Sequence, residues 1–588
     1  MSEPGPPTSF ASLGHFRISN CPGETPEKAS GVAWSYHSPA FKLELYEGNW
    51  TRAESEESIV ALTGEAYWNG ERVSAERLEQ LLKNGATIPP NLDGSFLLII
   101  ANLVSGSCMV CVDRLASKKA FYRQVGAGWT VSSSLQLAAT TQAALNVGAL
   151  AAYLLNGIPL GGQTLLQGIR ILPGGSTALL KAGGLTVQRY WTYDIDESFA
   201  GKSEKKLVSE FGELLFDGIA MRLRGDSLPR ILSLSGGYDS TCIMASALRV
   251  LGPKDIRAFS YVSAQGRADN ADAMIAADVS RHWKIDHRVI QIPEPPLREL
   301  VEGNARRAFA AANPCGELGI WTNLDQRLDF VPGQARLFFG DNIFGHDQNW
   351  RLSSREDALA WLPVPGLEEF AQLSPFLNEA TFEATKNAYA DVLGEVLERG
   401  AKIENPINLK DFFYFEQRAQ HALMPWRERF CGQHGQAVNP LMDGAVLEYY
   451  RHVPREYRRR RKLYRKTVEA MYPQFFERKR ATTLGSALSF RSMLNADAAW
   501  VDERIRTLHP ALAEVVSGPL IHALLPSLSG PAKAPEKSGW KPIARRWLKN
   551  TALGEATRGY VPRSRQIERE TILIRLLIAD GALRLLLR

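Results

Sequence analysis

The sequence predicts a mixed α/β protein with two unlike sheets and a helical C-terminal part. The first observation is a β-rich stretch with short turns from Ser58 to about Arg189. The second is an alternation of short apolar runs and amphipathic segments from Ser203 to Ile292, which is typical of a doubly wound parallel sheet. The third is the length of 588 residues, which exceeds one ordinary core and predicts two or three domains.

The N-terminal part is expected to start irregularly, over residues 1–55, and then to form strands. Phe96–Ile100 and Cys108–Val112 are short apolar runs of the kind that form buried strands. Ser105-Gly106 marks the turn between them. Trp129–Val131 is a third expected strand.

The second part begins with a helix, since apolar residues from Leu207 to Leu223 recur at steps of three and four. The expected strands and helices that follow are a strand at 230–234, a helix at 241–250, a strand at 256–262, a helix at 271–281, a strand at 287–292 and a strand at 336–340. Residues 409–471 are expected to be mostly helical, and 526–535 has the composition of a linker. We therefore expect domains at 1–200, 201–525 and 526–588, the last being a basic C-terminal extension.

Composition excludes several classes of protein. Six cysteines, at 21, 108, 111, 242, 315 and 431, do not make a disulfide framework and indicate a reducing cytoplasm. The pair Cys108 and Cys111 is interpreted as buried and structural, with a metal or redox role as the alternative. No signal peptide or membrane span is found in the sequence. The basic run 455–466 is either a solvated helix face or a surface for phosphates, and no nucleic-acid motif accompanies it.

The chemistry is expected in the segment Leu234-Ser235-Gly236-Gly237-Tyr238-Asp239-Ser240, which follows a predicted strand and opens a helix. Adjacent glycines let a ligand approach the backbone, and the helix N-terminus favours anions. Asp239 would repel phosphates unless it holds Mg²⁺. The alternative is an ordinary strand-to-helix turn with a capping aspartate. The segment resembles the PP-loop of ATP pyrophosphatases, which implies cleavage of ATP between its α- and β-phosphates.

The resemblance extends over residues 58–485 and is to the asparagine synthetase family. The stretches that carry it are Gly64-Glu65-Ala66-Tyr67, Leu92-Asp93-Gly94-Ser95-Phe96, Asp113-Arg114, Lys119-Ala120-Phe121-Tyr122, Tyr190-Trp191, Phe259-Ser260-Tyr261, Gly340-Asp341-Asn342-Ile343-Phe344-Gly345 and Pro440-Leu441-Met442-Asp443. It implies a class II glutamine-amidotransferase-like domain of αββα type before a PP-loop synthetase domain. It also implies that Ser260 and Gly340 border ATP and that Asp239 and Asp341 bind Mg²⁺.

Departures from the family pattern narrow the function. A glutaminase of this class needs a cysteine as its first mature residue, whereas Ser2 follows Met1 and Cys21 lies in another context. Thr63 stands where the family has an asparagine that helps to hold glutamine. The N-terminal domain is therefore interpreted as degenerate, without an ammonia supply.

Two branches of the family resemble a chain without that cysteine. β-Lactam synthetases use a Tyr–Glu dyad as base, and the corresponding residues here are interpreted as Phe338 and Gln436, neither of which accepts a proton as required. Lasso-peptide cyclases join the N-terminal amine of a precursor peptide to an Asp or Glu side chain, and this resemblance is the better one. It implies a leader-cleaved precursor peptide as substrate, with a leader peptidase and a leader-recognition protein as partners.

Lys479 is the candidate for stabilising the adenylate and the tetrahedral oxyanion, with a plain surface basic run as the alternative. Lys462 and Arg465 resemble a phosphate-binding helix of the family, or else lie on a solvated face. His434 is a weaker candidate near the amine. Asp269 and Asp272 are interpreted as helix caps.

The sequence thus predicts an ATP- and Mg²⁺-dependent ligase that adenylates a peptide carboxylate. A β-lactam-type or other small-molecule amide synthetase is the alternative, and a non-catalytic scaffold is a third possibility that the intact Asp239 and Asp341 disfavour.

Overall fold

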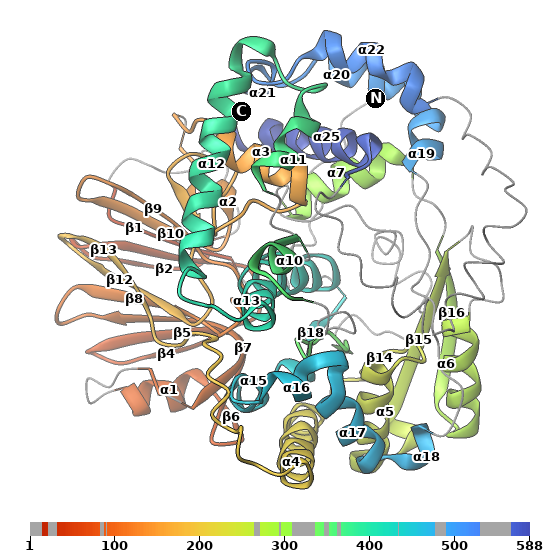
Figure 1. The fold of residues 1–588 in the computed structure, drawn as a ribbon. Helices are drawn as coiled ribbons and strands as arrows, with labels where there is room; N and C mark the ends of the chain where they lie inside the picture. Colours follow the sequence, from red (N-terminus) through yellow and green to blue (C-terminus); the bar gives the residue numbers. More distant parts are fainter. Residues whose placement is uncertain are drawn as a thin grey trace, which may run out of the picture.

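The computed structural model describes residues 15–21, 32–82, 88–89, 91–140, 142–263, 271–292, 296–308, 335–345, 352–360, 366–432, 434–476, 490–529 and 566–587. Two sheet-containing parts lie side by side (Figure 1). Antiparallel strands between residues 16 and 189 form the first part, and parallel strands between residues 230 and 438 form the second. No helix in these described ranges is long and apolar enough to cross a membrane.

The N-terminal domain is a sandwich of two antiparallel sheets. Its elements are β1 (Phe16–Ser19), β2 (Val32–His37), β3 (Lys42–Tyr46), β4 (Trp50–Glu54), β5 (Ser58–Trp68), β6 (Glu71–Val73), α1 (Ala75–Leu82), β7 (Leu92–Asn102), β8 (Ser107–Val112), β9 (Phe121–Val125), β10 (Gly128–Ser132), α2 (Leu135–Ala138), α3 (Val147–Asn156), β11 (Ile169–Ile171), β12 (Ser176–Lys181) and β13 (Gly184–Arg189). One sheet has the order β11-β9-β10-β1-β3-β2. The other has the order β13-β12-β8-β7-β5-β4, with β6 beside β5.

Helices cover both outer faces of this sandwich. Apolar side chains from both sheets fill the space between them, and Phe16, Leu97 and Val131 are each at most 1% exposed. Leu78 of α1 packs with Leu98 on the outer face of the second sheet. Helix α2 packs on β9 and β10, on the first sheet. This helix–sheet–sheet–helix layering confirms the expected αββα class.

The expectation of irregular structure over residues 1–55 is wrong. Strands β1 to β4 lie there, and β1 is an interior strand between β3 and β10. Phe16 and Ile18 of β1 and Leu43 of β3 are fully buried. The apolar alternation in these strands covers only four to six residues each, which is too short to separate from a loop without knowing the partner strands.

The Cys108 and Cys111 pair is structural, as predicted. Side chains three residues apart on a strand point to opposite faces. Accordingly, Cys108 packs between the two sheets, while Cys111 packs with α1 on the outer face. Both are free, buried thiols whose pKa is raised by burial. They cannot bind one metal ion together in this arrangement.

The second domain is built on five parallel strands in the order β16-β15-β14-β17-β18. Its elements are α4 (Glu204–Leu223), β14 (Arg230–Ser233), α5 (Tyr238–Val250), η1 (Pro253–Asp255), β15 (Ile256–Ser263), α6 (Ala271–His282), β16 (Asp286–Ile292), α7 (Leu297–Ala308), β17 (Arg336–Phe338) and β18 (Gln436–Val438). The four strands predicted here from the sequence are confirmed. Strand β18 interrupts the stretch that was expected to be helical.

Both faces of the parallel sheet are covered, as a doubly wound sheet requires. Leu232 and Phe338 point into a core shared with α4 and α5. Ile231 and Leu337 point into the opposite core, which includes α7 and the C-terminal helices. The two cores together confirm the predicted fold class.

The remaining elements are mostly helices. They are α10 (Arg355–Ala360), α11 (Leu367–Phe370), η3 (Ala371–Leu373), η4 (Glu379–Thr381), α12 (Phe382–Arg399), α13 (Pro406–Phe413), η5 (Tyr414–Leu423), α14 (Met424–Trp426), η6 (Arg427–Cys431), η7 (Pro440–Met442), α15 (Gly444–Arg451), α16 (Arg455–Arg458), η8 (Arg459–Arg461), α17 (Lys462–Met471), α18 (Pro473–Phe476), α19 (Phe490–Ala496), α20 (Ala498–Arg506), α21 (Pro510–Ala513), α22 (Gly518–Ser529) and α25 (Arg569–Leu586).

Helix α25 lies near the end of the chain but belongs to the core. It packs on α7 and α3, and Ile572, Leu576 and Leu583 are fully buried (Figure 1). Arg575 Nη1 donates to the carbonyl of Leu154 at 2.7 Å. The predicted domain limits at 200 and 525 stay predictions, and this helix joins the last predicted segment to the other two.

One long helical segment runs between the two domains, and we call residues 406–431 the interdomain helix. It consists of α13, η5, α14 and η6, where η5 and η6 are π-helical. Arg189 of the N-terminal domain donates two hydrogen bonds of 2.9 Å to Glu416. The amide of Gly161 donates to the side chain of Gln417 at 3.0 Å.

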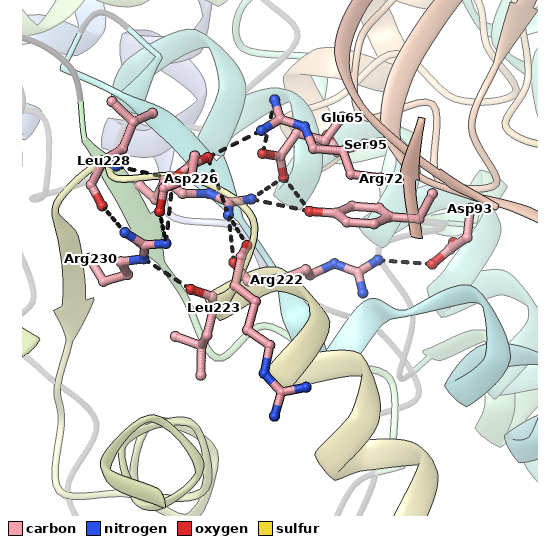
Figure 2. Close-up of polar contacts among 12 residues, drawn as sticks. Glu65, Arg72, Asp93, Ser95, Arg222, Leu223, Asp226, Leu228 and Arg230 are labelled. Atoms are coloured by element: carbon pink, nitrogen blue, oxygen red, sulfur yellow. Dashed lines mark hydrogen bonds and ion pairs between the residues drawn. The ribbon is translucent and has the colours of Figure 1, made fainter. Parts of the chain in front are cut away.

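Buried ion pairs join the domains directly (Figure 2). Arg336, fully buried at the start of β17, donates to the carboxylate of Glu65 and, at 3.2 Å, to the hydroxyl of Tyr67. Arg222 of α4 pairs with Asp93 at 2.9 Å. Three of these partners, Glu65, Tyr67 and Asp93, lie in stretches that resemble the amidotransferase family. In this chain they anchor one domain to the other.

Candidate active site

The predicted loop lies between β14, the central strand, and α5. The amide of Ser235 donates to the hydroxyl of Ser240 at 3.2 Å, which curls the loop back on the start of α5. Gly236 has a φ of +66°, and a Cβ there would lie 2.8 Å from Cγ2 of Ile275. Gly237 is the N-cap of α5 and supplies no side-chain cap. The first amides of this helix therefore remain available to an anion.

The backbone at Gly340 brings the two predicted metal ligands together. Strands β14 and β17 are adjacent and parallel, so their carboxyl ends meet at the same edge of the sheet. A Cβ on Gly340 would lie 2.8 Å from Cβ of Asp239. Asp341 follows directly in the chain. The sequence predicted Gly340, Asp239 and Asp341 as one site, and the structure places all three at this edge.

Arg461 contacts Asp239 from the opposite side. Its Nη2 donates to Oδ1 of Asp239 and, at 3.4 Å, to the side chain of Asn342. Burial and this carboxylate have opposite effects on the guanidinium, and the net result is a raised pKa for Arg461. Arg460 and Arg461 both have left-handed backbones, with φ of 52° and 58°. Such strain in non-glycine residues is concentrated at functional sites.

Arg427, in η6 of the interdomain helix, holds the second carboxylate. Its Nε lies 2.9 Å from Oδ2 of Asp341, and its Nη2 lies 3.3 Å from Oδ1. The guanidinium also stacks over the ring of Phe339, 4.2 Å from its centroid. Burial raises the pKa of Tyr414, on the same helix, and the negative charge of Asp341 also contributes to this increase.

Ser260 and Leu234 lie together at the neighbouring strand, β15. The Ser260 hydroxyl donates to the carbonyl of Leu234 at 2.7 Å and therefore accepts from Nε2 of His287, 2.8 Å away. Burial lowers the pKa of His287 to about 4. The imidazole is therefore neutral near pH 7. These contacts hold the start of the loop against the sheet.

The two carboxylates fit a magnesium ion bound with a nucleotide. Mg²⁺ is usually held by one or two carboxylates together with phosphate oxygens. No cluster of three or more His, Cys, Asp or Glu side chains suited to a metal occurs among the described residues. Asp239 and Asp341 therefore supply protein ligands only for an ion that also takes oxygens from ATP.

Several predicted residues stand elsewhere or are not described. Lys479 and Asp269 lie outside the described residues. Lys462 is partly exposed and pairs with Glu204 at 2.8 Å, in agreement with the solvated-face alternative. Arg465 stacks over the ring of Tyr238, 5.4 Å from its centroid.

The residues interpreted at the dyad positions do not form a pair. Phe338 lies opposite Val438, whereas Gln436 lies opposite Arg336, at the amino end of both strands. The loop is at the carboxyl end of the sheet. Phe338 is also buried in the core. Phe338 and Gln436 therefore do not form a catalytic base.

Sequence reasoning missed Arg427 and Arg461 as members of the site. Arg461 stands in the basic run 455–466, which was left open between a solvated face and phosphate binding. Its neighbour Arg458 is fully buried against Asp411 and Glu197, so the run is not one surface. A run of like charges carries no signal of which member points inward, and nothing in the sequence singled out Arg427.

The space beside Thr63, which stands where the resemblance places a glutamine-binding asparagine, is small. Thr63, His15 and Lys118 line a cavity of about 30 Å³ together with Arg429 of the interdomain helix. A cavity of that size holds one or two water molecules. Glutamine does not fit there in this structure.

Two family models match parts of the chain. A glutamine amidotransferase domain model matches residues 74–191, and an asparagine synthase model matches residues 210–305, which contain the loop. A search of curated proteins gave no match. The first match lies in the antiparallel sandwich, and the second lies in the part built on the parallel sheet.

Solved structures similar to the chain include two NAD synthetases and a tRNA thiolase. The glutamine-dependent NAD⁺ synthetase from Acinetobacter baumannii is 14% identical over 33% of this chain and 40% of its own, with a TM-score of 0.17. The NH₃-dependent NAD synthetase from Campylobacter jejuni is 12% identical over 37% and 94%, with a TM-score of 0.19. The U34-tRNA thiolase NcsA from Methanococcus maripaludis is 11% identical over 58% and 87%, with a TM-score of 0.22. The chain thus spans two fifths of the length of the first of these proteins. The three TM-scores are too low to support a conclusion about function.

The loop and strands β14, β15 and β16 of the parallel sheet lie in the part of the chain that the asparagine synthase model matches. The chain thus carries a region similar to a glutamine amidotransferase domain, followed by a region similar to asparagine synthase.

Proposed function

We propose that the protein forms an amide within a peptide, by adenylating an Asp or Glu side chain of a leader-cleaved precursor peptide for attack by its N-terminal amine. The observation that carries this proposal is the combination of two carboxylates at a nucleotide loop with an amidotransferase-like pocket too small for glutamine. Under this proposal the nitrogen comes from an amine on the substrate, with a second substrate as the alternative source.

The chain's own residues have distinct parts in this reaction. The loop from Ser235 to Ser240, with the first amides of α5, receives the departing pyrophosphate as a peptide carboxylate attacks the α-phosphate. Arg461 and Arg427 are close enough to neutralise phosphate charge once Asp239 and Asp341 turn to the metal. When bound, Mg²⁺ offsets charge on the phosphates. Lys479 is proposed to stabilise the acyl-adenylate and the oxyanion.

The partners and the location are part of the same proposal. A leader peptidase and a leader-recognition protein supply the free amine, and the reaction takes place in the cytoplasm without nucleic acid or membrane. The five free cysteines of the described residues agree with a reducing compartment.

The test is ATP–pyrophosphate exchange with synthetic linear peptides that carry a free N-terminus and one Asp or Glu at varied positions. Exchange with a peptide, and a product lighter by one water, are expected. Acetylation of the peptide N-terminus should leave exchange intact and abolish the product, whereas Asp→Asn in the peptide should abolish both. Exchange with free small amino acids alone would instead favour a small-molecule amide synthetase, and absence of exchange with any acid would refute ligase activity on both classes.

A further inference from the structure

The N-terminal domain contacts the same short segment that carries Arg427. Glu428, the next residue, pairs with Lys118 of the N-terminal domain at 3.0 Å. Ser95 Oγ donates to the same carboxylate at 3.3 Å. Arg429 Nη2 donates to the carbonyl of Ser133 at 2.9 Å. Three consecutive residues therefore connect the amidotransferase-like domain with Asp341.

This segment needs outside support because the helix is irregular there. In η5 the amide of Met424 donates to the carbonyl of Ala419, five residues earlier. The next donor in this pattern would be residue 425, but Pro425 has no N–H. The carbonyl of Gln420 is left without its helical donor. Lys119 Nζ of the N-terminal domain donates to it instead, at 2.6 Å.

Lys118 has little freedom in this arrangement. Its side chain passes over Gly64, where a Cβ would lie 2.4 Å from Cε of Lys118. The side chains of Lys118 and Glu428 are only 12% and 10% exposed. A charge pair this well shielded is weakly screened by solvent. The orientation of η6 is thereby tied to the N-terminal sandwich.

We infer that Lys118 is a positioning residue for the ligase site, acting through Glu428 to aim Arg427 at Asp341. The inference rests on the proposed function, since it takes Asp341 to be a ligand of the Mg²⁺–nucleotide complex. It gives the degenerate domain a present role: the domain sets the geometry of the neighbouring site without supplying ammonia.

The test measures binding of Mg²⁺ with a non-hydrolysable α,β-methylene ATP analogue by calorimetry, which needs no peptide and no turnover. We expect Lys118→Met to weaken this binding about 10-fold, the range seen when an outer-shell partner is lost. Lys118→Arg keeps the charge and should restore binding to within about twofold of the wild type. The matched control is Arg72→Met, which breaks the interdomain pair of Arg72 with Asp226, 3.2 Å apart, without removing a contact of η6, and should bind as the wild type does.

Unchanged binding by Lys118→Met would overturn the inference, as would failure of Lys118→Arg to restore it. Equal weakening by Arg72→Met would also overturn it, because any loosening of the domains would then suffice. If Lys118→Met does not fold, the double variant Lys118→Met/Glu428→Gln leaves no unpaired charge and takes its place with the same expected loss. Wild-type protein that binds no Mg²⁺–nucleotide refutes the proposed function itself, whereas wild-type binding with an unaffected variant refutes only the role of Lys118.

Discussion

Arg427 and Asp341 face each other side-on, with guanidinium nitrogens 2.9 Å and 3.3 Å from the two carboxylate oxygens. Arg461 contacts Asp239 through a single nitrogen, Nη2, which donates to Oδ1. Each predicted metal ligand is therefore held by an arginine. Under the proposed function, Mg²⁺ would take the place of an arginine at each carboxylate, and the arginines would then pair with phosphates.

Asp341→Asn should lower pyrophosphate exchange at least about 100-fold, since a preorganised charge at the phosphates is lost. The thermal midpoint should stay near that of the wild type, because Asp341 is partly exposed and an amide still accepts from Arg427. Asp278→Asn, on the exposed face of α6, is the control and should retain full exchange. Normal exchange by Asp341→Asn would remove this residue from the site.

Gly340→Ala should lose both stability and exchange. The new methyl group would stand 2.8 Å from Cβ of Asp239, so either the loop or β17 must shift. Overpacking of this kind costs about 1–3 kcal/mol in the free energy of unfolding. Gly183→Ala, where nothing lies within 4 Å, should change neither quantity. Thermal unfolding and the exchange assay check both, and a stable, active Gly340→Ala protein would contradict the close approach.

Glu65→Gln should destabilise the protein by up to about 3 kcal/mol, because the buried cation of Arg336 loses its closer carboxylate and keeps only Asp226, 3.6 Å away. The comparison is Glu54→Gln, which removes an exposed pair with Arg52 and should cost less than about 1 kcal/mol. Urea unfolding followed by tryptophan fluorescence distinguishes them. Similar midpoints for the two variants would mean that the interdomain pair contributes little.

Replacement of His287 should change how stability depends on pH. The pKa of His287 is about 4 when folded and returns to 6.5 when unfolded, so the unfolded chain binds more protons between these values. Stability from this group therefore rises as pH increases from 4 to 6.5 and is lost as pH falls through the same range. His287→Gln still donates to Ser260 but does not titrate.

The difference between the wild type and His287→Gln in the free energy of unfolding should vary by about 1 kcal/mol over that range, after allowance for partial exposure. Thermal midpoints of both proteins from pH 4 to 7 measure this difference, in which the other titrating groups cancel. A constant difference across the range would mean that His287 is not neutralised by burial.

Some parts of this structure follow from local sequence and others do not. The loop at Ser235 and the acid at Asp341 are local signals, since a strand, glycines and a helix start are contiguous in the chain. The strands before residue 55 depend on partners far along the chain, so short apolar runs gave no sign of them. Arg427 depends on where an irregular helix is placed by another domain, and that is a tertiary property. Gln436 was matched by its spacing from Pro440, but β18 places it at the amino end of the sheet.

Arg336 has a consequence for how this protein can be divided or recombined. Its guanidinium lies at zero exposure with its closer counter-charge, Glu65, on the other domain. A fragment that begins after β13 would lose Glu65 and leave this cation with Asp226, 3.6 Å away. Fragments and chimeras of this protein therefore need to keep Glu65 together with Arg336. The two domains are distinct folds, but we expect neither to be produced well without the other.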